Sequence, residues 1–215
     1  MHPVFVTGAT GYIGGRLIGA LHQRGYRVHA LVRKGSEAKL PDAVVPVVGD
    51  ALDASSFAYA IPADATLIHL VGTPRPSPAK AAEFHRVDVP SIKATTAAAQ
   101  QRAIRHLIYV SVAHPAPVMH AYIAAREEGE HVVEASGIPA TILRPWYVLG
   151  PGHCWPYLLV PVYAVLRCFA ATRAGAERLG LVTLEAMIAA LVNAVETPPT
   201  SGVRIIEVPE IRRFQ

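Results

Sequence analysis

The sequence has few cysteines and no metal-binding pattern. Its 215 residues include two cysteines, Cys154 and Cys168. Their spacing suits neither a disulfide framework nor a set of metal ligands, so we predict no disulfide fold and no metal site. We interpret them as buried thiols in a reducing cytoplasm.

Charge is also sparse. Lys and Arg total 20, Asp and Glu total 16, and the formal net charge is +4. The basic residues, mostly Arg, are scattered rather than clustered, which argues against nucleic-acid binding. An apolar run begins almost at residue 1, so no leader segment is expected.

The chain lacks a long uninterrupted apolar run. The longest, 155–171, is broken by Pro156, Pro161 and Arg167. It is too short and too interrupted for a membrane span. We expect a buried or capping helix, with contact to a membrane surface or a protein partner as the second interpretation.

Hydrophobic residues, in contrast, are plentiful. They make up 52% of the chain, and the mean hydropathy is +0.31. This composition predicts a folded protein with a large core. The length suits one domain spanning 1–215.

The most informative segment is 4–14, an apolar run followed by three spaced glycines. It predicts a strand, a turn and an amphipathic helix. Gly8 allows a tight turn, Gly11 lets a pyrophosphate approach the backbone, and Gly14 lets the helix pack closely on the strand. An ordinary strand-to-helix turn would not need three glycines at this spacing. The segment therefore predicts a dinucleotide site that includes Gly8, Thr10, Gly11, Tyr12, Ile13 and Gly14.

The end of the second predicted strand, 26–32, bears on the choice of cofactor. An acidic residue there would bind the ribose 2′-hydroxyl of NAD, whereas a basic one accommodates the 2′-phosphate of NADP. The strand is followed by Arg33 and Lys34, and Glu37 comes late. We therefore predict NADP(H) over NAD(H). The alternative is that Arg33 stacks on the adenine, which either cofactor allows.

Further cofactor contacts are expected after the next two strands. Asp50 follows the strand 44–48 and could either accept a hydrogen bond from the adenine amino group or only stabilise its turn. The strand 66–71 contains His69, which we interpret as a hydrogen-bonded core residue. Backbone at its end would pass beside the cofactor ribose. The residues expected at these two strand ends are Asp50, Ala51, Val71, Gly72 and Thr73.

Strands and helices continue to alternate along the chain. The pattern predicts an α/β fold, a doubly wound, mostly parallel sheet with helices on both faces. Ligands bind such sheets at the carboxyl ends of the strands. The remaining predicted elements are helices at 79–101, 121–136 and 184–196 and strands at 105–112, 140–143 and 203–208.

From residue 144 the pattern changes to a loop. We expect 146–180 to form a small lid over the site, with the loop 73–78 as a second cover. Aromatic residues would make the lid suit a flat or hydrophobic ligand or a partner surface, or would simply pack it onto the sheet. These residues are Trp146, Tyr147, Trp155 and Tyr157.

These motifs together resemble a known superfamily. The segment 7–14 is similar to the cofactor fingerprint of short-chain dehydrogenases/reductases, in their extended and atypical branches. Later landmarks fall in the same order: Tyr109-Val110-Ser111-Val112, Tyr122-x-x-x-Arg126, and Leu143-Arg144-Pro145 followed by Gly150-Pro151-Gly152. The resemblance implies a Rossmann-type NAD(P) site, with Pro145 among its cofactor contacts.

The same resemblance implies catalytic roles. Active members use a serine to orient the substrate oxygen, a tyrosine as general acid/base and a lysine. Ser111 and Tyr122 match the first two, and Arg126 stands at the lysine position. Arginine keeps the charge, but its planar fork does not simply replace a compact ammonium. His114 and His120 could supply a proton or could structure their loop.

The motifs and the resemblance leave two candidate functions for the protein. The first is an NADP(H)-dependent oxidoreductase of the atypical type, acting on a small, apolar carbonyl or related substrate. The second is a non-catalytic NAD(P)-binding redox sensor or assembly protein, which Arg126 and the apolar stretch motivate. A sugar-nucleotide epimerase is disfavoured because the lid looks too short. The expected partner is a small molecule or a protein at the lid, and the expected state is a monomer or homodimer.

Overall fold

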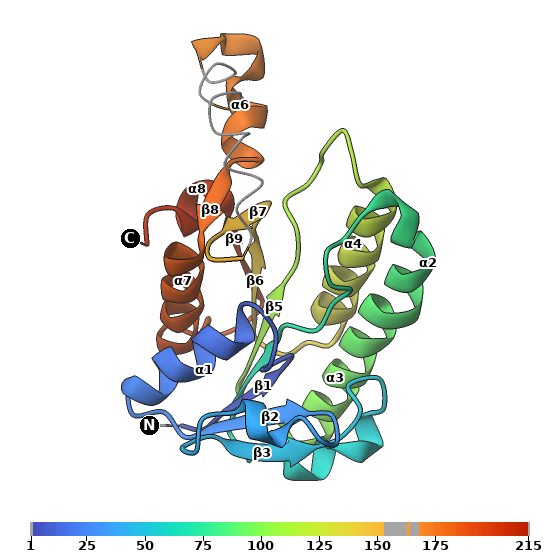
Figure 1. The fold of residues 1–215 in the computed structure, drawn as a ribbon, viewed down its shortest axis with the longest axis vertical. Coiled ribbons are helices and arrows are strands. Elements are labelled where there is room, and N and C mark those ends of the chain that lie inside the picture. Colours follow the sequence, from blue (N-terminus) through green and yellow to red (C-terminus); the bar gives the residue numbers. More distant parts are fainter. Residues whose placement is uncertain (1, 153–162, 164–167, 215) are drawn as a thin grey trace.

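The fold is built on a parallel sheet whose strand order reverses at its first strand. The structure is a computed structural model, which describes residues 2–152, 163 and 168–214. Among these residues a sheet of seven strands has the order β3-β2-β1-β4-β5-β6-β9, with every pair parallel (Figure 1). This confirms the predicted doubly wound fold. The strands are β1 (Val4–Thr7), β2 (Val28–Val32), β3 (Val45–Val48), β4 (Thr66–His69), β5 (His106–Val110), β6 (Ala140–Arg144) and β9 (Val203–Glu207).

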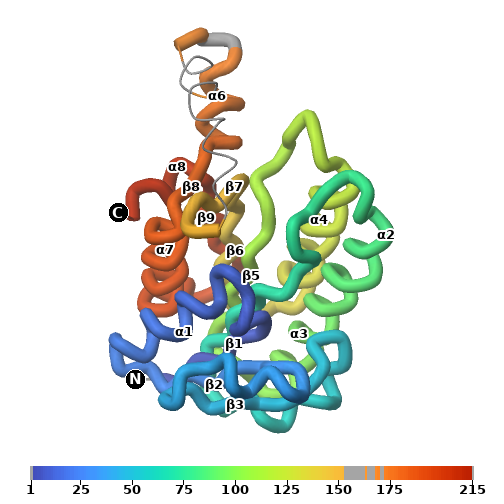
Figure 2. The backbone as a smooth tube through the Cα atoms, in the orientation of Figure 1, coloured from blue at the N-terminus to red at the C-terminus, as the bar shows by residue number. Residues whose placement is uncertain are grey.

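Helices cover both faces of this sheet. Figure 1 and Figure 2 show α1 and α7 on one side and α3 and α4 on the other. Side chains alternate along β1, so that Val4 and Val6 pack in the cluster with Leu17, whereas Phe5 packs in the opposite cluster. Burying a side chain of this size contributes about 1.5–3 kcal/mol. The helices are α1 (Gly14–Gln23), α3 (Val89–Gln101), α4 (His120–Ala135) and α7 (Leu184–Glu196).

The helix predicted at 79–101 is interrupted. A short helix α2 (Ala81–Glu83) leads into a π-helical turn η5 (Phe84–Asp88), and α3 follows. Pro90 lies in the first turn of α3 and has no N–H to donate, which breaks the regular hydrogen-bond ladder at this point. The remaining short helices are 3₁₀ turns: η1 (Glu37–Lys39), η2 (Ala54–Ser56), η3 (Ala58–Ala60) and η4 (Pro78–Lys80).

The region after β6 contains more structure than the predicted loop. Strand β7 (Tyr147–Leu149) pairs in parallel with β8 (Leu181–Thr183), and α8 (Val208–Ile211) follows β9. Helix α6 (Ala170–Arg178) extends away from the sheet (Figure 1). The interpretation of 155–171 falls mostly outside the described residues, as do Cys154, Trp155 and Tyr157. The lid function of 146–180 stays a prediction.

Two more predictions from the sequence concern the cysteines and the absence of a membrane span. Cys168 is exposed, so the expectation that it is buried is wrong. In the described ranges, no helix combines the length and the apolar character needed to cross a bilayer.

Two histidines lie inside the core. The Nδ1 atom of His69 lies 3.0 Å from the Thr7 hydroxyl and 2.9 Å from the Thr95 hydroxyl, which confirms the predicted core role. His106 Nε2 lies 2.9 Å from the Thr141 hydroxyl. Burial lowers the pKa of each histidine to about 3.

Because both histidines are neutral in the folded protein, acid should destabilise it. The unfolded chain takes up protons near pH 6.5 and the folded chain only near pH 3, so the free energy of unfolding falls as the pH drops through this window. By pH 5 each histidine should account for about 2 kcal/mol. Urea unfolding at several pH values measures this slope. His69→Gln should make this slope shallower by the contribution of one histidine, whereas the exposed His131→Gln should not. An unchanged slope in His69→Gln would contradict the assignment.

Candidate functional site

The predicted site residues follow the carboxyl ends of the strands. Because β1 to β6 are parallel, the segments after them meet at one edge of the sheet. The glycine turn follows β1, and the other predicted cofactor residues follow β2, β3, β4 and β6. Ser111 follows β5 directly.

The glycine turn has the geometry of a phosphate cradle. Gly8 has a φ of +73°, and a Cβ there would lie 2.7 Å from the carbonyl carbon of Leu70. A Cβ on Gly14 would overlap the Gly8 carbonyl oxygen, so helix α1 approaches β1 as closely as glycine permits. The first turn of α1 contains no acidic residue, so no carboxylate of this turn opposes an anion at the positive end of the helix dipole. The predicted roles of Gly8 and Gly14 fit this geometry.

A cleft of about 710 Å³ opens at this turn. That volume lies in the range of small-molecule and cofactor sites. Its walls are mainly apolar and aromatic, and Arg75 is the charged residue among the described ones that line it. The lining residues are Gly8, Gly11, Tyr12, Ile13, Gly14, Leu70, Gly72, Pro74, Arg75, Pro76, Val112, Met119, Tyr122, Trp146, Tyr147, Val148 and Gly152.

Other predicted cofactor residues lie around the cleft rather than in its wall. Thr10, Arg33 and Lys34 are exposed at the strand ends. Asp50 Oδ1 accepts a hydrogen bond of 2.9 Å from the N–H of Leu52, so the turn-stabilising interpretation is observed. The adenine contact of Asp50 stays a prediction, as does any contact from the adjacent, half-buried Ala51.

The loops after β4 and β6 are fixed by hydrogen bonds. Thr73 is buried, and both its N–H and its hydroxyl donate to Asp88 Oδ2, at 3.0 and 2.6 Å. The carbonyl of Val71 accepts from Arg126. The carbonyl of the buried Pro145 accepts from Ala113 at 2.9 Å, which joins the loops after β6 and β5.

The two predicted catalytic hydroxyls differ in their surroundings. Tyr122 is half-buried, lines the cleft, and has its ring centroid 5.1 Å from that of Phe84. Ser111 is only 3% exposed and is not among the residues that line the cleft, although its neighbour Val112 is. Its hydroxyl makes no hydrogen bond within the described part of the chain. A buried hydroxyl without a partner is uncommon and suits a group that a ligand oxygen completes.

Arg126 is buried behind the loop after β4 instead of lining the cleft. Its Nη2 lies 2.9 Å from Asp88 Oδ1, and its Nη1 donates to the carbonyls of Val110 and Val71, at 3.2 and 3.4 Å. Burial alone would lower the pKa of Arg126, but Tyr122, Tyr109 and Asp88 stabilise the cation and raise it above the usual value. A direct contact to the cofactor ribose stays a prediction.

Asp88 is a site residue that the sequence reasoning missed. It is 1% exposed and lies in the π-helical turn η5. The available signal was a single carboxylate between Val87 and Val89, before an alanine-rich segment. Such a residue in an apolar run predicts a buried partner of opposite charge.

A second ion-pair group holds the loop after β5. Glu130 on α4 pairs with Arg144, which also donates to Glu207 at 3.0 Å. His114 Nδ1 lies 3.1 Å from a carboxylate oxygen of Glu127. This fits the loop-structuring interpretation of His114. His120 is exposed at the start of α4, and a proton-donating role for either histidine stays a prediction.

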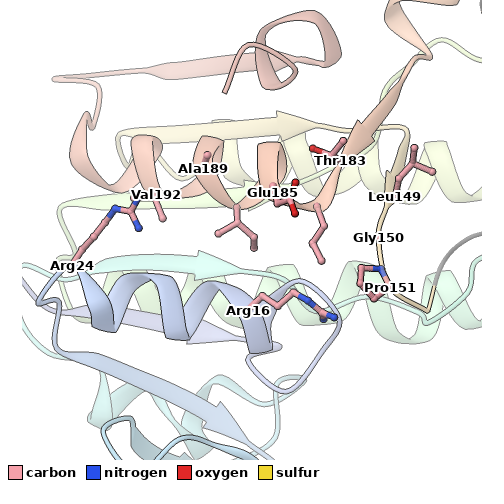
Figure 3. A pocket seen from close by; sticks show the side chains of 11 residues that line it. Arg16, Arg24, Leu149, Gly150, Pro151, Thr183, Glu185, Ala189 and Val192 are labelled. Atoms are coloured by element: carbon pink, nitrogen blue, oxygen red, sulfur yellow. The ribbon is translucent and has the colours of Figure 1, made fainter. Parts of the chain in front are cut away.

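A separate cavity of about 490 Å³ lies between α1 and α7. Figure 3 shows Arg16 and Arg24 on its α1 side and Glu185 and Val192 on its α7 side. It shares no lining residue with the cleft at the glycine turn and contains none of the predicted site residues. The cleft is therefore the candidate site.

Comparison with known proteins agrees with this assignment. The sequence profile of the NAD(P)H-binding family matches residues 8–151, from the glycine turn to the loop after β7. The chain belongs to this NAD(P)H-binding family. Its sheet order and its structural neighbours show that it has the fold of the short-chain dehydrogenase/reductase superfamily, in agreement with the predicted resemblance.

Three curated proteins that are similar to this chain in sequence are named as reductases. A ceramide reductase of Caulobacter vibrioides is 30% identical over 216 residues, which is 98% of this chain and 65% of that protein. A 3-diazoavenalumate denitrifying reductase of Streptomyces is 31% identical over 69% of this chain and 57% of its own length. A 4-hydroxy-2-methyl-3-oxo-4-farnesyl-3,4-dihydroquinoline-1-oxide ketoreductase of Stigmatella aurantiaca is 28% identical over 68% and 50%. The chain thus spans about half to two thirds of the length of these relatives.

Solved structures share the fold at low sequence identity. A short-chain dehydrogenase/reductase protein of Agrobacterium tumefaciens with bound NAD has a TM-score of 0.70 and 18% identity, over 96% of this chain and 77% of that one. The Bordetella bronchiseptica enzyme WbmH in complex with NAD⁺ has a TM-score of 0.72 and 18% identity, over 96% and 75%.

The glycine turn gives a direct test of NAD(P) binding. In Gly14→Ala the new Cβ overlaps the Gly8 carbonyl oxygen and must push α1 away from the turn, so we expect NADPH binding to weaken by about tenfold or more. Gly15→Ala is the matched control, because its Cβ would meet only Ala9 O at 3.8 Å. Fluorescence titration with NADPH measures both. Equal affinity in the two variants would show that the turn is not the phosphate site.

Proposed function

We propose that the protein is an NADP(H)-dependent oxidoreductase that reduces a carbonyl or related group of an apolar substrate. The observation that carries this proposal is a single cleft that joins the glycine turn at one end to Tyr122 and an apolar, aromatic wall at the other. The residues present fit a dinucleotide. The glycine turn borders the cleft in which the pyrophosphate would lie, and a side chain at Gly8 or Gly14 would clash with the neighbouring backbone. A bound reduced nicotinamide would supply a hydride to the substrate carbon.

Tyr122 is the proposed proton donor. In the reductive direction its hydroxyl would give a proton to the substrate oxygen as the carbonyl carbon is reduced, and it would regain a proton from solvent through the open cleft. Ser111 would donate its unpartnered hydroxyl to the same oxygen and fix its position. The product is the corresponding alcohol.

The wall of the cleft supports an apolar substrate. Val112, Met119, Trp146, Tyr147 and Val148 surround the space beyond the glycine turn. Two curated relatives are named for ceramide and for a farnesyl-bearing quinoline oxide, both of which carry long hydrocarbon chains. We infer a substrate with a hydrophobic body and one reducible group.

A second function rests on a specific observation. Arg126 is engaged by Asp88 and two carbonyls and does not line the cleft. Such a site could bind NAD(P) without turnover and act as a redox sensor. Reductase relatives of similar sequence favour the enzyme.

The basic end of β2 should select NADP(H). Arg33 and Lys34 are exposed and form no ion pair within the described residues, so either can bind a 2′-phosphate. Arg33→Ala should weaken NADPH binding by about tenfold or more and leave NADH affinity unchanged. Arg27→Ala, at the opposite end of the same strand, is the control. Equal losses for both cofactors in Arg33→Ala would contradict NADP(H) selection.

Tyr122→Phe tests catalysis. Removing the hydroxyl should lower kcat by about 10²–10⁴-fold while NADPH affinity and Tm stay the same, because the ring remains packed on Phe84. The assay follows NADPH oxidation with long-chain ketones, quinones and enones. Full activity in Tyr122→Phe would exclude it as the proton donor. NADPH binding without turnover of any of these substrates would support the sensor.

A further inference from the structure

We propose that Asp88 and Arg126 form a positioning pair that sets the loop 71–73 and the Tyr122 ring for hydride transfer, and that Arg126 does not itself contact the cofactor. The inference deepens the proposed function and rests on it. It assigns Asp88 a role in the site and gives Arg126 a role different from that of a catalytic lysine.

The two terminal nitrogens of the guanidinium contact protein acceptors from three segments, whereas Nε has no hydrogen-bond partner among the described residues. Nη2 pairs with Asp88 of η5, and Nη1 donates to Val71 after β4 and to Val110 at the end of β5. Arg126 is 6% exposed and is absent from the cleft wall. To reach a cofactor ribose it would have to give up these contacts and leave Asp88 buried without its cation, which is strongly unfavourable.

Asp88 carries the other half of the arrangement. Its Oδ1 faces Arg126, and its Oδ2 accepts both hydrogen bonds from Thr73. The pair therefore fixes the loop at both ends, Val71 through Arg126 and Thr73 through Asp88. Hydrogen bonds to charged groups in a buried setting are about twice as strong as neutral ones.

Gly72 lies between these two fixed points. It lines the cleft on one side, and on the other a Cβ would overlap the Arg126 guanidinium. The guanidinium thus forms the back support of the cleft wall at the place where the cofactor ribose is expected. A shift of the guanidinium would move this wall.

The pair also sets the position of the proposed proton donor. The guanidinium carbon lies 5.3 Å from the centroid of the Tyr122 ring, within cation–π distance. Phe84, one turn before Asp88 in η5, contacts the same ring at 5.1 Å between centroids. Tyr122 is therefore held by the same turn that supplies Asp88.

Lysine cannot reproduce this geometry. The guanidinium presents its donors in a planar fork that reaches Asp88, Val71 and Val110 together, whereas an ammonium is a single point of charge. Arg126→Lys should therefore act as a loss-of-function change here, although it restores the residue type that the resemblance assigns to this position.

The test compares three variants with a matched control. The variants are Asp88→Asn, Arg126→Lys and the double variant Asp88→Asn/Arg126→Met, which leaves no charge of the pair and serves if a single variant does not fold. The control is Lys93→Met/Glu128→Gln, which removes an exposed ion pair of 2.7 Å between α3 and α4. The readouts are the Kd for NADPH, the Kd for 2′,5′-ADP, which lacks the nicotinamide half, and kcat and KM.

Each variant should weaken NADPH binding by about tenfold and leave 2′,5′-ADP affinity within about twofold. We expect kcat to fall with little change in the KM for the substrate. The double variant should be no worse than the more affected single variant, because the two residues act through one contact. The control should match the wild type in every readout.

The proposal is overturned if Arg126→Lys binds NADPH as tightly as the wild type or has a higher kcat, or if Asp88→Asn behaves like the control. It is also overturned if 2′,5′-ADP affinity falls as much as NADPH affinity, which would indicate general distortion. Wild-type protein that binds neither NADPH nor NADH would overturn the proposed function together with the positioning role. Wild-type binding with unaltered variants overturns the positioning role alone.

Discussion

The parallel pairing of β1 with β4 is the constraint on which the candidate site depends. It places the turn after β1 directly beside the loop after β4, so closely that a Cβ on Gly8 would meet the Leu70 carbonyl carbon at 2.7 Å. Helix α1 must then begin at Gly14, against the same turn. The contact between the turn after β1 and the loop after β4 thus determines where the cleft lies, where an anion can bind and where Gly72 forms its rear wall.

The buried Asp88–Arg126 pair is the feature that sets this protein apart from the catalytic pattern its sequence resembles. Removing two charges from water is costly, and the cost is offset here by the ion pair itself, by two hydrogen bonds from Thr73 to Asp88 and by two from Arg126 to backbone carbonyls. We infer that the main role of the pair is to set the shape of the site rather than to add stability. It also explains why an arginine at a lysine position is compatible with an intact cleft.

The sequence was sufficient for the features that depend on local pattern. The spaced glycines, the alternation of strands and helices and the core position of His69 were all predicted, because each needs a residue type at a fixed spacing or within an apolar run. The interruption of the helix predicted at 79–101, the strand pair β7–β8 and the Asp88–Arg126 contact were not predicted. Asp88 and Arg126 are far apart in the chain, so their contact depends on the packing of η5 on α4, which no local pattern encodes.

A crystal structure with NADP⁺ bound would test the positions of Arg126 and the cofactor together. We expect the pyrophosphate at the glycine turn, Arg33 or Lys34 at the 2′-phosphate, the nicotinamide beside Tyr122, and Arg126 still paired with Asp88 behind Gly72. An Arg126 side chain that has left Asp88 to hold the ribose hydroxyls would contradict this expectation.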